Sequence, residues 1–298
     1  MNKLFWFLKV LFPAYLFFIQ ITPVKGQIEL ISERISRGKL IAPELTEVSG
    51  IVSSSVNQNC FWTHNDSGDL AQVYLIDSTA KLLKTYSLES VDVFDVEDIA
   101  RIKINDKFFL ILADIGDNRG VRKSIQLIIF EEPIYQNDKG LSVIPKENIE
   151  VKKLIYQGKP KDAEAIFVDP VDHMFYLISK REFQSTLYVA DIFSQIKDNY
   201  QLKPLLKFPF TFITAADISD RGDAILMKSL TKIYYWRRNP ANSILEELAK
   251  PYKIINYQVE PQGEAICFPN QSAKSFFTIS ERPLGLDSYL YYYKFKDN

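Results

Sequence analysis

A hairpin pattern that occurs five times along the chain constrains its fold more than any other feature. The clearest copy, residues 162–179, reads DAEAIFVDPVDHMFYLIS. An acidic start leads into a short apolar segment, a turn containing Pro170 follows, and a second apolar segment runs back, which is typical of a β-hairpin. The other copies lie at residues 48–68, 95–118, 214–230 and 262–283.

The copies recur with a regular period. One isoleucine can be aligned in each copy, and these residues lie 48, 67, 52 and 48 apart: Ile51, Ile99, Ile166, Ile218 and Ile266. A period near 50 that contains only strand-like segments is typical of an all-β propeller built from four-stranded blades. The sequence therefore predicts five blades. The alternative is six blades, with the extra one inside the long second repeat.

The two ends of the chain are predicted to complete one blade together. The fifth repeat ends after its third strand-like segment, whereas residues 28–40, IELISERISRGKL, precede the first repeat and have no partner of their own. We expect this segment to supply the outer strand of the last blade, because closing the ring hides the exposed sheet edges.

The first 26 residues differ from the rest. A basic start, an apolar middle and the ending TPVKG predict a signal peptide, 1–26, that is cleaved before Gln27. A retained membrane anchor is the alternative, but Lys9 and Pro13 interrupt the apolar run, and a span needs about 20 apolar residues. No cysteine follows for lipid attachment. We expect a secreted or periplasmic protein whose residues 27–298 form a single propeller domain without a membrane span.

Charge and cysteine content add little to this prediction. The formal net charge is −1, so no basic field is available for nucleic acid, and we expect a monomer. Cys60 and Cys267 fall in neighbouring blades of a closed ring. The sequence leaves open whether they form a disulfide or remain buried thiols.

The hairpin geometry predicts where chemistry can occur. Antiparallel strands bring the start of each first strand beside the end of the second, so the residues at both places should share one rim of the central channel. The first set is Glu47, Ser49, Asp95, Glu97, Asp162, Glu164, Thr214, Asp217, Gln262 and Glu264. The second set is His64, Asn65, Asp66, Asp114, Asp117, Asn118, Lys180, Arg181, Glu182, Lys228, Glu281 and Arg282.

Three glutamates, Glu97, Glu164 and Glu264, occupy the same place in their repeats, where the other two have Ser49 and Ala216. Carboxylates that converge on one axis repel unless a cation or proton intervenes, and Ca²⁺ prefers oxygen ligands. The candidate further oxygen donors are Asp66, Asp114, Asp117 and Asn118. Alternatively, the glutamates cap backbone N–H groups or pair with the basic residues Lys180, Arg181, Lys228 and Arg282. These residues and the oxygen donors are also our candidates for binding a small anionic ligand at the rim.

A catalytic constellation is not evident. His64 and Asp66 are the candidates for assisting a water molecule, whereas His173 falls in a turn at the opposite face. No G-x-S-x-G motif accompanies them, and one rim histidine with two separated cysteines cannot supply the usual zinc ligands.

The repeated starts DVEDI, SGI, DAEAI and GEAI, with the loops HNDSG and ADIGDN, resemble the SdiA-regulated family of bacterial propellers over residues 47–295. The resemblance implies a five-bladed exported protein with a calcium ion near the channel axis. The fourth repeat departs from it, with Ala216 in place of a glutamate. A more distant similarity is to secreted, phytase-like propeller phosphoesterases and lactonases, which hydrolyse esters with metal-activated water.

Two functions therefore remain open. The first is an exported, non-catalytic binding or scaffold propeller that holds Ca²⁺ at its channel mouth and binds a small anionic ligand or a protein partner. The second is a Ca²⁺-dependent hydrolase of phosphate or lactone esters, with Glu97, Glu164 and Glu264 as metal ligands.

Overall fold

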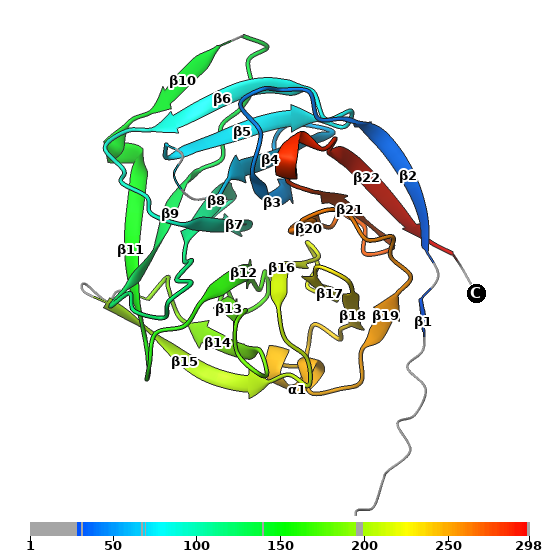
Figure 1. Cartoon of the computed structure of the whole chain (residues 1–298). Helices are drawn as coiled ribbons and strands as arrows, with labels where there is room; N and C mark the ends of the chain where they lie inside the picture. Colours follow the sequence, from blue (N-terminus) through cyan, green and yellow to red (C-terminus); the bar gives the residue numbers. More distant parts are fainter. Residues whose placement is uncertain are drawn as a thin grey trace, which may run out of the picture.

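The computed structural model describes residues 29–30, 32–66, 68, 70–138, 140–194 and 199–296. The predicted signal peptide, 1–26, lies outside the described residues. The described strands form sheets arranged around a central axis, as a propeller does (Figure 1). The prediction of an all-β propeller is confirmed.

Each of the first two units winds outward from an inner strand. The first consists of β3 (Val48–Ser53), β4 (Cys60–Asn65), β5 (Gln72–Asp77) and β6 (Leu82–Leu88). The second consists of β7 (Val96–Ile104), β8 (Lys107–Asp114), β9 (Ile125–Glu131) and, after a 3₁₀ turn (Lys146–Asn148), β11 (Ile149–Tyr156).

The next three units follow the same plan. The third consists of β12 (Ala163–Val168), β13 (Phe175–Ser179), β14 (Thr186–Ala190) and β15 (Asn199–Lys207). The fourth consists of β16 (Ile213–Ile218), β17 (Ala224–Ser229), β18 (Ile233–Arg237), the helix α1 (Ile244–Leu248) and β19 (Lys253–Ile255). The fifth consists of β20 (Ala265–Cys267), β21 (Ser275–Ile279), a second 3₁₀ turn (Pro283–Gly285) and β22 (Tyr289–Phe295).

The inner strands form a closed circle. β3 contacts β7, β7 contacts β12, β12 contacts β16, β16 contacts β20, and β20 contacts β3. Figure 1 shows these strands nearest the axis, with later strands of each unit farther out. Each of the five units therefore contributes one inner strand to the circle.

The N-terminal segment completes the fifth unit, as predicted. β2 (Ser32–Lys39) pairs antiparallel with β22, for example Ile35 with Tyr292. The two-residue strand β1 (Glu29–Leu30) precedes β2 and pairs in parallel with β19 of the fourth unit. The start of the chain thus lies along two neighbouring units and covers the edge that β22 would otherwise expose.

The long second repeat contains an added strand. β10 (Leu141–Ile144) leaves the second unit and pairs in parallel with β6, with Ser142 opposite Tyr86. β11 also pairs in parallel with β15, so the outer strands of the second and third units join in one eight-stranded sheet. The added length therefore extends an outer edge.

Apolar side chains fill the space between neighbouring sheets. Ile111 and Leu127 of the second unit pack in one cluster with Ile166 and Leu177 of the third. Trp62 and Phe130 pack in another between the first two units. Each fully buried large side chain contributes about 1.5–3 kcal/mol to stability, so packing between sheets holds the inner strands and their rim residues in place.

Cys60 is half-buried and Cys267 is buried, and both are free thiols. Within the described residues, no helix has the length and apolar character that a membrane crossing requires.

Candidate functional site

A β-bulge at the start of the inner strands positions the predicted glutamates. The pairing of β7 with β8 skips Glu97, between Val96 and Asp98, and the pairing of β12 with β13 skips Glu164, between Ala163 and Ala165. A bulge leaves one residue unpaired and redirects its side chain. Glu264 directly precedes Ala265, which pairs with Ile279 as Ala165 pairs with Ile178. The three glutamates are therefore equivalent, as predicted.

The fourth unit has a different register from the one predicted. Its bulge falls between Ile213 and Ala215, so Thr214 takes the place of a glutamate. The prediction that Ala216 stands there was wrong by two residues, because Ile218 was aligned as the repeated isoleucine. Asp217 consequently lies farther along β16, away from the acidic rim at which it was predicted.

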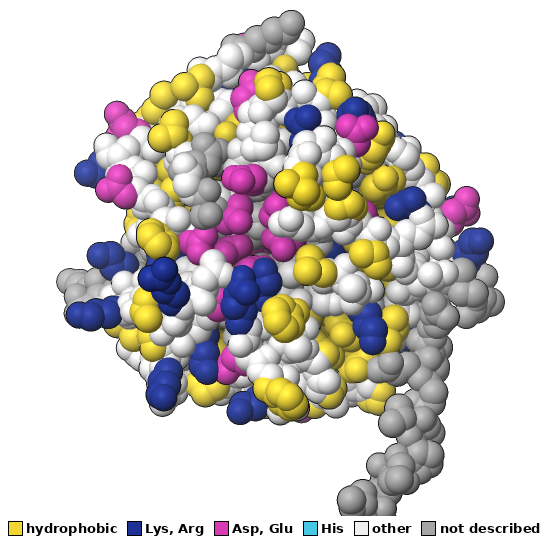
Figure 2. Space-filling view, viewed as in Figure 1, with side chains coloured by type: hydrophobic (Ala, Val, Ile, Leu, Met, Phe, Trp, Pro, Cys, Tyr) yellow, Lys and Arg dark blue, Asp and Glu magenta, His cyan; other side chains and the backbone are white. Residues whose placement is uncertain are grey.

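The rim carries a compact group of carboxylates. Asp66, Asp95 and Glu97 each contribute one carboxylate oxygen to a group whose atoms lie within 4.8 Å of one another, and we call these residues the first carboxylate trio. The same holds for Glu97, Asp162 and Glu164, the second carboxylate trio. Figure 2 shows acidic side chains gathered at the centre of this face, above the inner strands. Glu97 belongs to both trios.

Backbone hydrogen bonds bring a second ring of residues to the same rim. A residue just after the second strand donates its N–H to the carbonyl of the residue two before the bulge position: Asp66 to Glu47, Lys180 to Asp162 and Glu281 to Gln262. Asp66, Lys180 and Glu281 therefore occupy equivalent positions in the first, third and fifth units. This confirms that the starts of the first strands and the ends of the second strands meet.

Glu97 is the least compensated acid of this group. It is only 3% exposed, and within the described residues no hydrogen bond or ion pair reaches its carboxylate. Burial first, then the charges of Glu164, Asp66 and Asp95, raise the pKa of Glu97 well above its usual range. A buried carboxylate without a partner is unfavourable, so Glu97 favours a proton or a cation.

Lys180 is the basic side chain inside the group. Its ammonium forms an ion pair with Glu164 Oε2 and lies 3.7 Å from Glu264 Oε1. Burial would lower the pKa of Lys180, but Glu164 and Glu264 outweigh it and raise that pKa above its usual value. Lys180 therefore remains charged at neutral pH.

Other carboxylates near Lys180 also hold protons more strongly than usual. Burial, with Glu264, raises the pKa of Glu164 to about 8 although Lys180 opposes the shift. Burial, with Glu264 and Asp66, raises the pKa of Glu281 to about 7. One ammonium is thus insufficient to balance the acids around it.

Gly116 provides the room in which two carboxylates meet. A Cβ atom at this position would lie 2.3 Å from both Asp95 Oδ2 and Glu97 Oε1. The glycine of the ADIGDN loop is therefore explained by the close approach of side chains to its backbone.

The remaining predicted oxygen donors have structural partners or lie outside the trios. Asp114 is buried and accepts hydrogen bonds from Arg122 Nη1 (2.8 Å) and Gln126 Nε2 (2.7 Å). Asp117 accepts from the Arg122 backbone N–H at 2.7 Å. Asn118 is exposed in the same loop. Asp114 and Asp117 thus fasten the loop that carries Gly116.

The predicted basic residues separate into three environments. Arg181 is exposed and donates from Nε to Asp162 Oδ2 at 2.6 Å. Arg282 is half-buried and donates to the Ala42 carbonyl at 3.3 Å. Lys228 is fully buried, where it donates to the Gly263 carbonyl, and burial lowers its pKa to about 8. Of these four basic residues, Lys180 and Arg181 form ion pairs with acids of the second carboxylate trio, Glu164 and Asp162.

His64 lies below the rim rather than on it. It is 1% exposed, and its Nδ1 lies 2.9 Å from the Asn65 carbonyl oxygen. Burial lowers the pKa of His64 to about 4, so the imidazole is neutral and weakly basic at pH 7. This environment does not favour His64 as the base for a water molecule at the rim.

Asp95 and Asp162 belong to the trios, but the predicted ligand set omitted them. Both were expected at the rim, and both precede a bulged glutamate by two residues. Residues two apart on a strand project from the same face, so the repeated pattern D-x-E was the signal that could have identified them as ligands.

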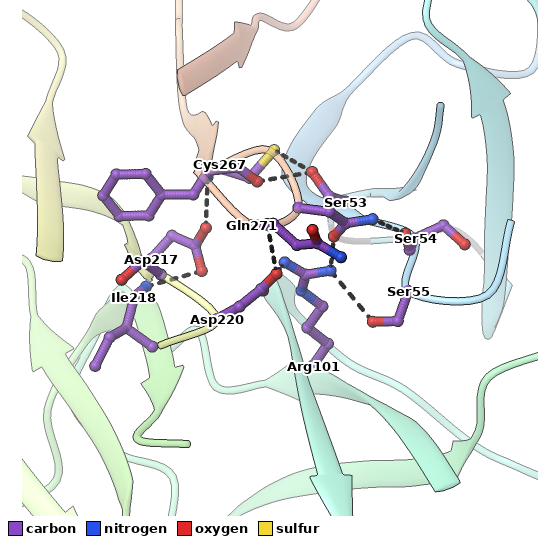
Figure 3. A network of polar contacts seen from close by, with 12 residues as sticks. Ser53, Ser54, Ser55, Arg101, Asp217, Ile218, Asp220, Cys267 and Gln271 are labelled. Carbon is purple, nitrogen blue, oxygen red and sulfur yellow. Dashed lines mark hydrogen bonds and ion pairs between the residues drawn. The ribbon is translucent and has the colours of Figure 1, made fainter. Parts of the chain in front are cut away.

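The opposite mouth has a different composition. Arg101 donates to Ser55 Oγ at 3.2 Å and also bonds Asn270 and Asp220 (Figure 3). Asp217 accepts the Phe268 N–H at 2.6 Å, which links the fourth unit to the fifth. Arg101, Asp217 and Asp220 border a cavity of about 280 Å³ that also has apolar walls from Phe108 and Pro170. The two ends of the axis therefore differ in charge.

No protein-family model matches the chain, and no match is found among curated proteins. Among solved structures, the chain is similar to a nidogen/laminin complex, with a TM-score of 0.44 and 10% identity over 79% of this chain and 73% of that one. It is also similar to an auxiliary nutrient binding protein from Bacteroides thetaiotaomicron, with a TM-score of 0.46 and 10% identity over 85% of this chain and 70% of that one.

Proposed function

We propose that this protein is a non-catalytic binding propeller whose acidic mouth holds a divalent cation, with Ca²⁺ preferred. The observation that carries the proposal is Glu97, a buried carboxylate without a hydrogen bond or ion pair in the described part of the chain, shared by two trios whose oxygens lie within 4.8 Å. A cation placed there would offset the burial and the repulsion that raise the pKa of Glu97 well above its usual range.

The donor set favours Ca²⁺ over other common ions. All the candidate ligands are carboxylates, and hard oxygen donors suit Ca²⁺ and Mg²⁺ better than zinc or copper. The donors come from loops and bulges of different units, and Ca²⁺ accepts such irregular geometry, whereas Mg²⁺ demands a near-ideal octahedron. Of the predicted ligands, Glu97 with Asp66 supports this site best, and Glu164 and Glu264 lie beside it with Lys180.

A bound cation would also create a place for a ligand. Arg181 is exposed next to Asp162, so a small anionic ligand could bridge the cation and this guanidinium. We propose that the protein is exported, on the basis of the predicted signal peptide, and that it belongs with the SdiA-regulated propellers it resembles. A protein partner remains the alternative ligand.

A function as a hydrolase is less well supported than a function in binding. A metal-dependent ester hydrolase needs a base to activate water, and the buried environment of His64 does not favour that role. Asp66 remains the candidate at the rim itself.

Thermal unfolding of chelator-treated protein tests the proposal. We expect Ca²⁺ to raise the melting temperature, EDTA to reverse the rise, and Mg²⁺ to have a smaller effect, because a ligand that binds only the folded state stabilises it. A screen of phosphate and lactone esters in Ca²⁺ should show no turnover. A melting temperature indifferent to Ca²⁺ would contradict cation binding, and turnover abolished by Asp66→Asn would favour the hydrolase.

A further inference from the structure

We infer that Lys180 is a built-in cation that takes the place of a second divalent ion in the acidic mouth. The inference deepens the proposed function and rests on it, because it concerns how many external cations the mouth accepts. It assigns Lys180 the role of setting that number to one.

The position of Lys180 in the repeat is the first reason. Asp66 and Glu281 occupy the equivalent place in the first and fifth units, each donating its backbone N–H to the residue two before the bulge position. Where these units add a carboxylate to the mouth, the third unit adds an ammonium. Lys180 therefore replaces an acid with a base at the rim.

The contacts of Lys180 are the second reason. Its side chain is 9% exposed, and its Nζ forms an ion pair with Glu164 and lies 3.7 Å from Glu264. These two glutamates come from different units and would otherwise face each other across the mouth without compensation. An ammonium between two carboxylates occupies the same electrostatic environment that a metal ion would require.

The contrast between the trios is the third reason. In the second carboxylate trio, Glu164 is paired with Lys180, and Asp162 accepts from Arg181 Nε at 2.6 Å and from the Asp117 N–H at 3.0 Å. Glu97, which both trios share, has neither kind of partner within the described residues. The basic side chains thus neutralise the side of Glu164, whereas no ion pair within the described residues reaches Glu97 or Asp95 of the first carboxylate trio.

The mouth should accordingly bind one external cation at the first carboxylate trio. Seven acids gather here: Asp66, Asp95, Glu97, Asp162, Glu164, Glu264 and Glu281. Lys180 and Arg181 form ion pairs with three of them, Glu164, Glu264 and Asp162. If Lys180 is neutralised, Glu164 and Glu264 lose their cation, and Ca²⁺ should enter between them.

Calorimetric titration of Ca²⁺ into purified Lys180→Met tests this inference. We expect the wild-type protein to bind one Ca²⁺ and Lys180→Met to bind two, with a larger rise in melting temperature on Ca²⁺ addition. Lys161→Met is the matched control, because Lys161 pairs with Glu182 at the same rim, outside the trios. It should bind one Ca²⁺, as the wild type does.

Lys180→Gln is a second variant, for use if Lys180→Met does not fold. The glutamine amide is neutral but can still donate a hydrogen bond to a carboxylate. A variant that folds only when Ca²⁺ is present, monitored by circular dichroism, would also support the inference. If both variants stay unfolded in Ca²⁺, or fold and bind one Ca²⁺ with wild-type affinity, the inference is overturned.

The result for the wild type separates this inference from the proposed function. One Ca²⁺ in the wild type and one in Lys180→Met would leave the proposed function standing and remove the role of Lys180. Binding by Lys180→Met alone would support the role of Lys180 and remove the native Ca²⁺ site. Binding by neither protein would overturn both.

Discussion

Glu97 and Asp98 show that burial alone does not mark a binding residue. The two are adjacent in the same bulge and are 3% and 2% exposed. The Asp98 carboxylate accepts backbone N–H groups of Ile99 and Ile166, each at 2.8 Å, and thereby links the second unit to the third. Glu97 has no such partner among the described residues. The difference in hydrogen bonding identifies Asp98 as structural and Glu97 as available for a cation.

Gly116→Ala should weaken cation binding while leaving the fold intact. The added Cβ would meet the ends of the Asp95 and Glu97 side chains, which can move away, so overpacking should cost no more than about 1–3 kcal/mol. Their displacement separates the oxygens of the first carboxylate trio. We expect Ca²⁺ affinity to fall about tenfold, or about 1.4 kcal/mol. Calorimetry measures the affinity, and unchanged Ca²⁺ binding would show that Gly116 does not shape the site.

Asp217→Asn should change how stability depends on pH. Burial raises the pKa of Asp217 from 3.8 to about 7, so the folded state keeps this proton at pH values where the unfolded state has lost it. Rising pH therefore favours unfolding between pH 4 and 7, and the contribution of protonated Asp217 to stability is lost across that range. The wild type should lose up to about 1.4 kcal/mol per pH unit relative to the variant.

Urea unfolding of both proteins at several pH values between 4 and 8 checks this prediction. The unfolding free energy of Asp217→Asn should increase relative to that of the wild type as the pH rises. The difference between the two should become constant above pH 7. A difference that stays constant across this range would mean that Asp217 titrates normally.

At the scale of strands, the sequence predicted the repeated hairpins well, because alternating apolar segments and turn residues are local signals. The fourth unit was misaligned because it carries no acid before its inner strand, and Thr214 could not be distinguished from Ala216 by residue type. β10 was not predicted as an added strand, because its partner, β6, lies more than 50 residues earlier in the chain. Register and distant edge pairing depend on contacts that a single sequence does not display.

Removing β2 should open the ring. A chain that begins at Leu40 lacks the strand paired with β22 along seven residue pairs, and each lost backbone hydrogen bond contributes about 0.5–1.5 kcal/mol. We expect a lower melting temperature and association through the exposed β22 edge. A chain that begins at Ser32 is the matched control, because it loses only β1.

Size-exclusion chromatography with thermal unfolding checks this prediction. The chain that begins at Ser32 should elute as the full protein does, and the chain that begins at Leu40 should elute earlier or aggregate. Equal elution and equal melting of the two chains would show that β2 does not close the ring.

At the scale of the whole molecule, a net charge of −1 conceals an asymmetry along the axis. One mouth gathers carboxylates around Glu97, and the other is organised by Arg101 and its neutral and acidic partners. The sequence predicted that Glu97, Glu164 and Glu264 share the acidic rim, because strand direction brings them together, but it also placed Asp217 and His64 there. It left open whether the glutamates bind a metal ion or a lysine, because that choice depends on how far the side chains extend. In the structure, Lys180 extends to Glu164 and Glu264 but not to the first carboxylate trio.

Calorimetric titration of Ca²⁺ into the wild type and Glu97→Gln tests the cation site most directly. Glu182→Gln is the control, because this acid pairs with Lys161 outside the trios. We predict that the wild type and Glu182→Gln bind Ca²⁺ equally, that Glu97→Gln binds at least about tenfold more weakly, and that without Ca²⁺ Glu97→Gln melts at a higher temperature than the wild type. Equal Ca²⁺ affinity in all three proteins, or no binding by the wild type, would contradict the account.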